Sequence, residues 1–165
     1  MRATLTPALA LDYLRELSTD LRAGVVLDAA GEPLAGLADV TSAARRLVAS
    51  CPDARGLEIG VSDGYACVLA SARHTLVLAV GPFALPGLLF HDMTGVLALL
   101  SPSEDSGIEA GLRPGPRAAE RRQASVRWCP PGRGALVAMS PADPRHAVLV
   151  RQGRALLEAA AAASK

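Results

Sequence analysis

The sequence has few aromatic residues. Tryptophan, tyrosine and phenylalanine make up 3% of its 165 residues, whereas apolar residues as a class make up 50%. Leucine, valine and alanine must therefore fill the interior, because the side chains that bury the largest areas are nearly missing. A chain of this length suits one domain of about 100 residues with an appendage.

Cysteine is also scarce. Cys51, Cys67 and Cys129 are an odd number of cysteines without Cys-x-x-Cys or Cys/His ligand spacing. This pattern favours reduced thiols in a cytoplasmic protein over a disulfide framework or a zinc site. We therefore expect neither a bound metal nor another cofactor.

The N-terminus lacks the basic region and apolar run of a signal peptide. The longest apolar stretch, residues 81–100, has the length of a membrane span but contains Pro82, Pro86, His91 and Asp92. Burial inside a fold or at a protein interface is favoured over a bilayer. We expect a cytoplasmic protein without a membrane span.

The charges are nearly balanced. The formal net charge of +1 gives no whole-chain argument for nucleic-acid binding. Residues 1–102 contain seven Arg against ten Asp or Glu (net −3), and residues 103–165 contain ten Lys or Arg against six Asp or Glu (net +4). The composition therefore changes near Ser101-Pro102.

Residues 22–37, RAGVVLDAAGEPLAGL, predict a β-hairpin. The Asp28 side chain is expected to bond the backbone just ahead of it, and Gly31 to adopt a positive φ in the turn. A hairpin this short is not stable alone in water. The rest of the chain is expected to cover or extend it.

Three segments predict helices. The first runs from an N-cap at Thr6 to Leu21, the second from an N-cap at Asp39 to about Ser50, and the third covers residues 85–100. The apolar stripe expected on the first helix consists of Leu5, Leu9, Tyr13, Leu17 and Leu21, with Leu14 beside them. The stripe expected on the second consists of Val40, Ala43, Ala44, Leu47 and Val48.

Between the second and third helices the hydrophobic period changes to two. Leu57, Ile59 and Val61 alternate with other residues, and Asp63-Gly64 is a strong hairpin turn signal. The return strand is followed by residues 75–80, which are apolar on both faces and therefore predicted to be central. The segment predicts an antiparallel meander of three strands.

This order of elements resembles the Roadblock/LC7 family over residues 5–100. The features that match are the leading amphipathic helix, the hairpin AGVVLDAAGEPLAGL, the helix ADVTSAARRLVAS, the meander GLEIGVSDGYACVLASARHTLVLAV and the closing leucine-rich helix. The resemblance implies an α/β protein of the α+β type with a profilin-like layout. It implies a five-stranded antiparallel sheet with the second helix on one face and the first and third helices on the other.

The resemblance also implies a homodimer. Roadblock proteins usually pair through the second helix and the following strand, here residues 39–50 and 56–62. That strand, predicted at the sheet edge, needs a partner or a guard. The expected dimer or partner interface consists of Val40, Ala43, Ala44, Arg45, Arg46, Leu47, Leu57, Ile59 and Val61.

The partner that the resemblance implies is a small Ras-like GTPase. Bacterial members of the family commonly accompany such a GTPase as activators or scaffolds. Known activators resemble platforms that reposition the GTPase's own residues, so no catalytic side chain carries over. The expected function is a non-enzymatic regulatory or scaffold module, with Arg45 and Arg46 as polar contacts to the partner.

The residues whose side chains could act in catalysis or ligand binding are interpreted as structural. His74 is interpreted as a solvated turn residue, His91-Asp92 as surface or capping residues on a helix, and Cys67 as a buried thiol. Cys51, at a helix end, is interpreted as a packing residue, with exposure and oxidation as the alternative. Gly132-Arg133-Gly134 lacks the Gly-Lys-Ser/Thr ending of a P-loop.

The tail divides into a linker and a helical end. We expect a domain over 1–101, a Pro/Gly/Arg-rich linker over 102–133 that contains the basic run RAAERRQ, and a short strand with a helix over 134–165. The helix begins at Asp143-Pro144. Three positions are open for it: on its own domain, on a dimer mate or on a partner. The alternative function for the whole chain is a small-molecule sensor of profilin-like or PAS-like layout, with a ligand beneath a helix.

Overall fold

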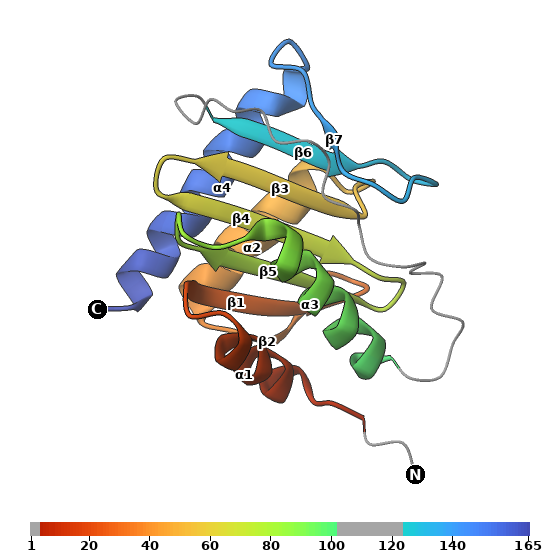
Figure 1. Ribbon diagram of the computed structural model, residues 1–165, viewed down its shortest axis with the longest axis vertical. Helices are drawn as coiled ribbons and strands as arrows, with labels where there is room; N and C mark the ends of the chain where they lie inside the picture. The colour runs from red at the N-terminus through yellow and green to blue at the C-terminus, as the bar shows by residue number, and fades with distance from the viewer. Residues whose placement is uncertain (1–3, 102–123) are drawn as a thin grey trace.

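The computed structural model describes residues 4–101 and 124–165. Its centre is an antiparallel sheet of seven strands in the order β2-β1-β5-β4-β3-β6-β7 (Figure 1). The helices are α1 (Pro7–Leu17), α2 (Ala38–Ser50), α3 (Pro86–Leu100) and α4 (Pro144–Ala163). The strands are β1 (Leu21–Asp28), β2 (Pro33–Ala35), β3 (Gly56–Val61), β4 (Gly64–Ala70), β5 (His74–Val80), β6 (Ser125–Cys129) and β7 (Val137–Ala138).

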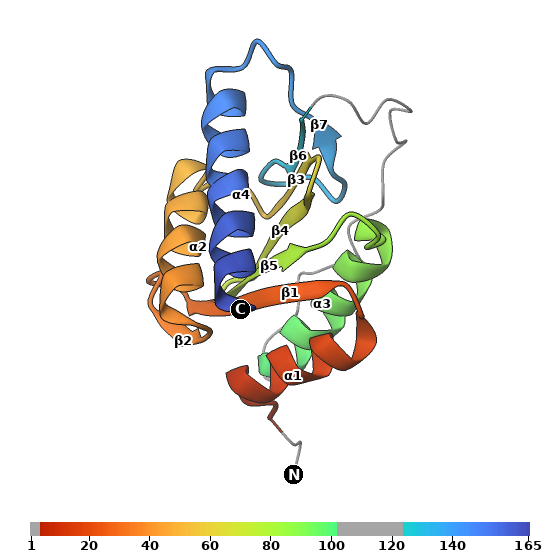
Figure 2. The same ribbon diagram turned by 90° about the vertical axis from the view of Figure 1, so that its left-hand side faces the viewer.

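The sheet lies between two helical layers. Helices α2 and α4 cover one face, and α1 and α3 cover the other (Figure 2). Strand β5 is central, and its side chains are buried on both faces: Val77 points toward α2 and α4, Leu76 and Leu78 toward α1 and α3. The predicted layering of the first three helices is confirmed, whereas the predicted five strands are two too few.

The β1–β2 hairpin forms as the sequence predicts. The Asp28 carboxylate oxygen Oδ1 accepts hydrogen bonds from the backbone N–H groups of Ala30 and Glu32, each at 2.9 Å. Gly31 has a φ of +80°, which favours a residue without a Cβ. The turn therefore holds its shape through one side chain and one glycine.

Helix α1 begins as predicted, but of the apolar residues predicted for its stripe only Leu14 is buried within the helix. Thr6 Oγ1 accepts a hydrogen bond from the backbone N–H of Leu9 at 3.3 Å, and the helix ends four residues before Leu21, which opens β1. A four-residue spacing advances about 40° around the helix at each step, so a stripe of five such residues cannot stay on one face. The buried face is Ala10, Leu11 and Leu14, and the half-exposed residues are Leu9, Tyr13 and Leu17.

Helix α2 starts one residue before Asp39. The N-cap is Leu37, without a side-chain cap hydrogen bond, so the predicted cap at Asp39 is wrong. Asp39 lies in the first turn, where a carboxylate interacts favourably with the helix dipole. The start of α2 is therefore stabilised by charge rather than by a capping side chain.

The predicted linker contains a strand. Residues Ser125–Cys129 form β6, so the interpretation of that part as linker is wrong. The predicted strand after Gly134 is β7, and α4 begins after Asp143, whose carboxylate accepts the backbone N–H of Arg145 at 2.9 Å. The basic run RAAERRQ lies outside the described residues.

Candidate interaction surfaces

Strand β3 is an interior strand. It pairs with β4 along its whole length and with β6 from Gly56 to Gly60, both antiparallel. Leu57 and Ile59 are at most 1% exposed, and Val61 is partly buried. The expectation that this strand lies at an edge is therefore wrong. A second copy can pair with β3 only after β6 has left.

The apolar residues predicted for the dimer face of α2 are inside the molecule. Val40, Ala43, Ala44 and Leu47 are at most 2% exposed and belong to one buried cluster with residues of α4. Figure 2 shows α4 lying alongside α2 on the same face of the sheet. The chain therefore occupies with its own C-terminal helix the surface that was expected to meet another copy.

Two of the predicted interface residues remain exposed. Arg45 and Arg46 point outward from α2, and Arg45 Nη2 donates to Glu32 Oε1 at 3.0 Å. Both partners in this ion pair are at least 49% exposed, so the pair contributes little to stability. Both arginines are accessible to a partner.

A buried ion pair crosses from β3 to β6. Glu58 and Arg127 are opposite each other in the register, with Arg127 Nη1 at 3.6 Å from Glu58 Oε2. Their side chains are 11% and 13% exposed, respectively. Opposite charges facing each other across two strands stabilise the pairing, and removal of one leaves the other poorly solvated. The C-terminal segment thus supplies a cation to a carboxylate of the core sheet.

Helix α4 crosses β3 at a glycine. A Cβ on Gly153 would lie 2.8 Å from Ile59 Cγ2, closer than carbon atoms pack. Glycine in a helix interior costs about 1 kcal/mol relative to alanine. The close contact with the sheet accounts for a residue that the helix alone would disfavour.

The first turn of α4 is fixed by several contacts of Arg145. Its guanidinium lies 4.4 Å from the centroid of the Trp128 ring and pairs with Asp143 Oδ2 at 2.8 Å. The guanidinium and the backbone N–H of Arg145 donate hydrogen bonds to the Asp143 carboxylate, and these lower the pKa of Asp143 to about 2. Burial raises the pKa of the Cys51 thiol, and the nearby Arg145 guanidinium opposes that shift. Since Cys51 follows the last residue of α2, the start of α4 lies beside the end of α2.

Apolar side chains are exposed on the opposite layer. Phe83 is 89% exposed. The sequence contains only two phenylalanines, so one of its few large aromatic side chains lies outside the core. Its loop is fixed by Asp20, whose backbone oxygen accepts the N–H of Gly81 and whose Oδ2 accepts the N–H of Phe83, each at 2.9 Å. Leu85 and Leu88 follow at 54% and 62% exposure. The Phe83 side chain therefore projects into solvent from a loop whose backbone is held by two hydrogen bonds to Asp20.

The other residues considered for chemistry, His74 and the three cysteines, are partly or fully buried. His74 Nδ1 lies 3.0 Å from Ser101 Oγ, and burial together with Arg73 lowers the pKa of His74. Cys51, Cys67 and Cys129 are all free and buried. Burial, with the nearby Glu58 carboxylate, raises the pKa of Cys67 well above its usual range. The predicted burial of Cys67 is confirmed, and the burial of Cys51 agrees with its interpretation as a packing residue rather than with the alternative of exposure.

Neither metal ligands nor a membrane helix emerge from the part of the chain that the structure describes. No group of three His, Cys, Asp or Glu residues there is placed to hold a metal ion. No helix within residues 4–101 and 124–165 combines the length and hydrophobicity needed to cross a membrane.

Three features of the structure were not predicted from the sequence: strand β6, the close contact at Gly153 and the exposure of Phe83. The signal for β6 was present in Val126 and Trp128, two residues that favour strands, within an otherwise linker-like composition. Gly153 was detectable as a glycine inside a helical pattern, which often marks close packing. Nothing in the sequence alone distinguishes the exposed Phe83 from a buried one.

No family model matches the chain, and no curated protein matches it. Among solved structures, the chain is similar to the Roadblock/LC7 domain from Streptomyces avermitillis, with 21% sequence identity and a TM-score of 0.46, over 53% of this chain and 91% of that chain.

Proposed function

We propose that this protein is a non-enzymatic regulatory or scaffold module of the Roadblock/LC7 type that acts by binding another protein. The observation that carries the proposal is the arrangement of the first five strands. They lie in the order β2-β1-β5-β4-β3, with α2 on one face and α1 and α3 on the other, which is the layout implied by the resemblance in the sequence. The partner implied by the same resemblance is a small Ras-like GTPase.

The exposed apolar side chains support a protein partner. Phe83, Leu85 and Leu88 are 89%, 54% and 62% exposed and lie within six residues of sequence, and apolar side chains that are exposed close together often mark a protein contact site. The proposed contact surface consists of Phe83, Leu85 and Leu88, with Arg45 and Arg46 as polar contacts on the other layer. The module binds the GTPase and modulates its activity or its location.

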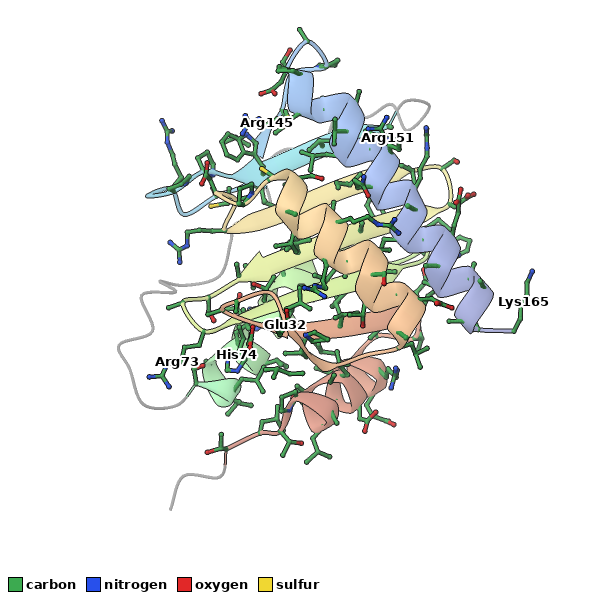
Figure 3. The ribbon with its side chains drawn as sticks, turned by 180° about the vertical axis from the view of Figure 1, so that it is seen from behind. Glu32, Arg73, His74, Arg145, Arg151 and Lys165 are labelled. Carbon is green, nitrogen blue, oxygen red and sulfur yellow. The ribbon has the colours of Figure 1, made fainter. Side chains whose placement is uncertain are left out.

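We propose that the protein is a monomer and not the expected homodimer. A twofold axis between two copies of β3 would make them antiparallel, and β6 is antiparallel to β3 in this chain. It would likewise make two copies of α2 antiparallel, and α4 runs against α2, since Arg145 at its start lies near Cys51 at the end of α2 (Figure 3). Residues 124–163 therefore take the position that a second copy would occupy.

Light scattering on the full chain tests the copy number. We expect one species with the monomer mass of 17.0 kDa. A stable dimer with β6 and α4 still protected from hydrogen exchange would contradict the single-chain arrangement. A dimer in which they exchange at once would show that a second copy has replaced them.

Direct binding tests the partner. Purified small Ras-like GTPases from the same cell, loaded with GDP or a non-hydrolysable GTP analogue, are passed over the immobilised full chain. We expect saturable binding by one of them, weakened about tenfold or more by Phe83→Ser because exposed aromatic anchors dominate interfaces. Leu99→Ser, at the far end of α3 where Leu99 is 48% exposed, is the matched control. No binding by any of the GTPases would overturn the assignment.

A further inference from the structure

A cavity of about 460 Å³ lies at one end of the sheet, under the C-terminal end of α2. It is bordered by the β1–β2 turn, the last turns of α2 and the β4–β5 turn. Its lining includes no residue of α4 or β6. Figure 3 shows Glu32, in the β1–β2 turn, and His74, the first residue of β5 after the β4–β5 turn, on the opposite side of α2 from α4. The C-terminal segment therefore closes one flank of α2 and leaves this one open.

The cavity exists because its walls are built from small side chains. Six of the 17 lining residues are alanines, and none is aromatic. The floor is aliphatic: Leu27, Leu57 and Val68 are at most 3% exposed. Cavities of this volume with apolar walls and a few polar groups are typical sites for small molecules. The shape and the lining together suit a compact apolar body.

The charged groups at the rim differ in how strongly they are engaged. Asp28 uses Oδ1 to accept two backbone N–H groups of its own turn, at 2.9 Å each, so this oxygen is engaged within the turn. Arg45 is bound to Glu32 through Nη2 at 3.0 Å, and its side chain is 49% exposed. An exposed pair of this kind exchanges partners readily, and a guanidinium binds carboxylates through two parallel hydrogen bonds. Arg45 is therefore the group at the rim best suited to bind an anion.

We propose that this cavity binds a small molecule that has an apolar body and one anionic group. The body lies on Leu27, Leu57 and Val68, and the anionic group binds Arg45 at the rim. Arg45 is also a proposed polar contact to the partner, but the two proposals have separate tests. GTPase binding is tested by Phe83→Ser on the other helical layer, whereas the cavity is tested by octanoate binding to the chain alone. A failure of one proposal leaves the other standing.

Octanoate is a suitable probe, and 1-octanol is its uncharged counterpart. Each is titrated into the full chain while the methyl resonances of the alanines are followed by NMR. We expect octanoate to give saturable shifts at Ala49 and Ala70, which line the cavity, at concentrations below about 5 mM. Octanol, which cannot pair with Arg45, is expected to bind about tenfold more weakly or worse.

Two adjacent arginines on α2 provide a matched pair of variants. Arg45→Gln should weaken octanoate binding about tenfold and leave octanol binding unchanged, because only the anion pairs with this side chain. Arg46→Gln removes the same charge from a position outside the cavity and should leave both affinities within about twofold. Ala49→Phe, at an exposed lining position, should fill the cavity and abolish binding of both probes.

Three results would overturn the proposal. The first is the absence of saturable shifts with either probe. The second is a set of shifts centred on Ala84, which follows Phe83 in the sequence, rather than on Ala49 and Ala70, which would show adsorption to the exposed apolar surface. The third is equal weakening by Arg45→Gln and Arg46→Gln, which would show a general charge effect. The arginine variants change exposed residues, so they decide the matter even where Ala49→Phe fails to fold.

Discussion

The guanidinium of Arg145 stacks 4.4 Å from the ring centroid of Trp128 and so joins the first turn of α4 to strand β6. The same side chain pairs with Asp143, the N-cap of the helix. Trp128 is the one tryptophan of the sequence, so its fluorescence reports on the C-terminal segment and on nothing else. This relationship makes the docking of β6 and α4 on the core measurable.

Replacing Arg145 should loosen the segment. Arg145→Ala removes the stacking on Trp128 and the pair with Asp143, and a cation–π contact at a partly exposed site contributes about 1 kcal/mol. We expect the free energy of unfolding from denaturant titration, followed by Trp128 fluorescence, to fall by about that amount. Arg151→Ala, on the exposed side of the same helix, is the control and should change it by less than about 0.5 kcal/mol. Equal effects of the two substitutions would show that the stacking does not stabilise the segment.

Two helix glycines should respond to alanine in opposite directions. Gly95→Ala in α3 should stabilise the protein by about 1 kcal/mol, because nothing lies within 4 Å of its added Cβ and alanine is the better helix former. Gly153→Ala should destabilise it by about 1 kcal/mol, because the Cβ would lie 2.8 Å from Ile59 Cγ2 and overpacking outweighs the gain in propensity. Thermal unfolding by circular dichroism measures both. Stabilisation by Gly153→Ala would show that α4 sits less tightly on β3 than described.

The ion pair between β3 and β6 predicts a strong effect of one side chain. Arg127→Met leaves the Glu58 carboxylate with one partner fewer at a site where it is 11% exposed, and we expect a loss of about 2 kcal/mol. Arg133→Met, at an exposed position in the following turn, should change the stability by less than about 0.5 kcal/mol.

The double variant separates charge from packing. Glu58→Gln combined with Arg127→Met removes the buried charge, so much of the lost stability should return. The single variant Glu58→Gln completes the comparison. If the loss of stability in the double variant equals the sum of the losses in Glu58→Gln and Arg127→Met, then the two side chains do not interact and the register alone places them together.

The first hundred residues were predictable because their signals are local. The Asp28 and Gly31 turn, the Asp63-Gly64 turn and the two-faced apolar strand β5 each depend on neighbours within a few residues. The face of α1 was predicted only in part, with Leu14 correct and Leu9, Tyr13 and Leu17 wrong, because a spacing of four residues was taken as one stripe. The correct face, around Leu11 and Leu14, follows from the 3.6-residue period.

The closure of β3 could not be predicted from local pattern. Gly56 and Cys129 are paired across more than 70 positions of sequence, and nothing near either residue specifies the other. An arginine beside apolar residues has the same local sequence pattern whether its side chain is exposed or, like that of Arg127, buried in an ion pair. The candidate interface on α2 was therefore identified as an apolar face, and the structure shows which segment covers it.

The pH dependence of the start of α4 follows from Asp143. Its pKa is lowered from an ordinary 3.8 to about 2 by hydrogen bonds from Arg145, so the ionised form stabilises the folded state. That contribution is fully present above about pH 5 and is lost as the pH falls through the folded pKa. Asp143→Asn keeps a side chain that can cap a helix but removes the charge, so its stability lacks this component at every pH.

The difference in free energy of unfolding between the wild type and Asp143→Asn isolates this residue. Other carboxylates titrate in both proteins and cancel in the difference. Urea titrations followed by Trp128 fluorescence should give a constant difference from pH 7 to about pH 5 and a smaller one at pH 3. A difference that stays constant down to pH 3 would show that Arg145 does not hold the Asp143 carboxylate in its ionised form, and the attachment of α4 would then rest on its apolar contacts with α2 and β3.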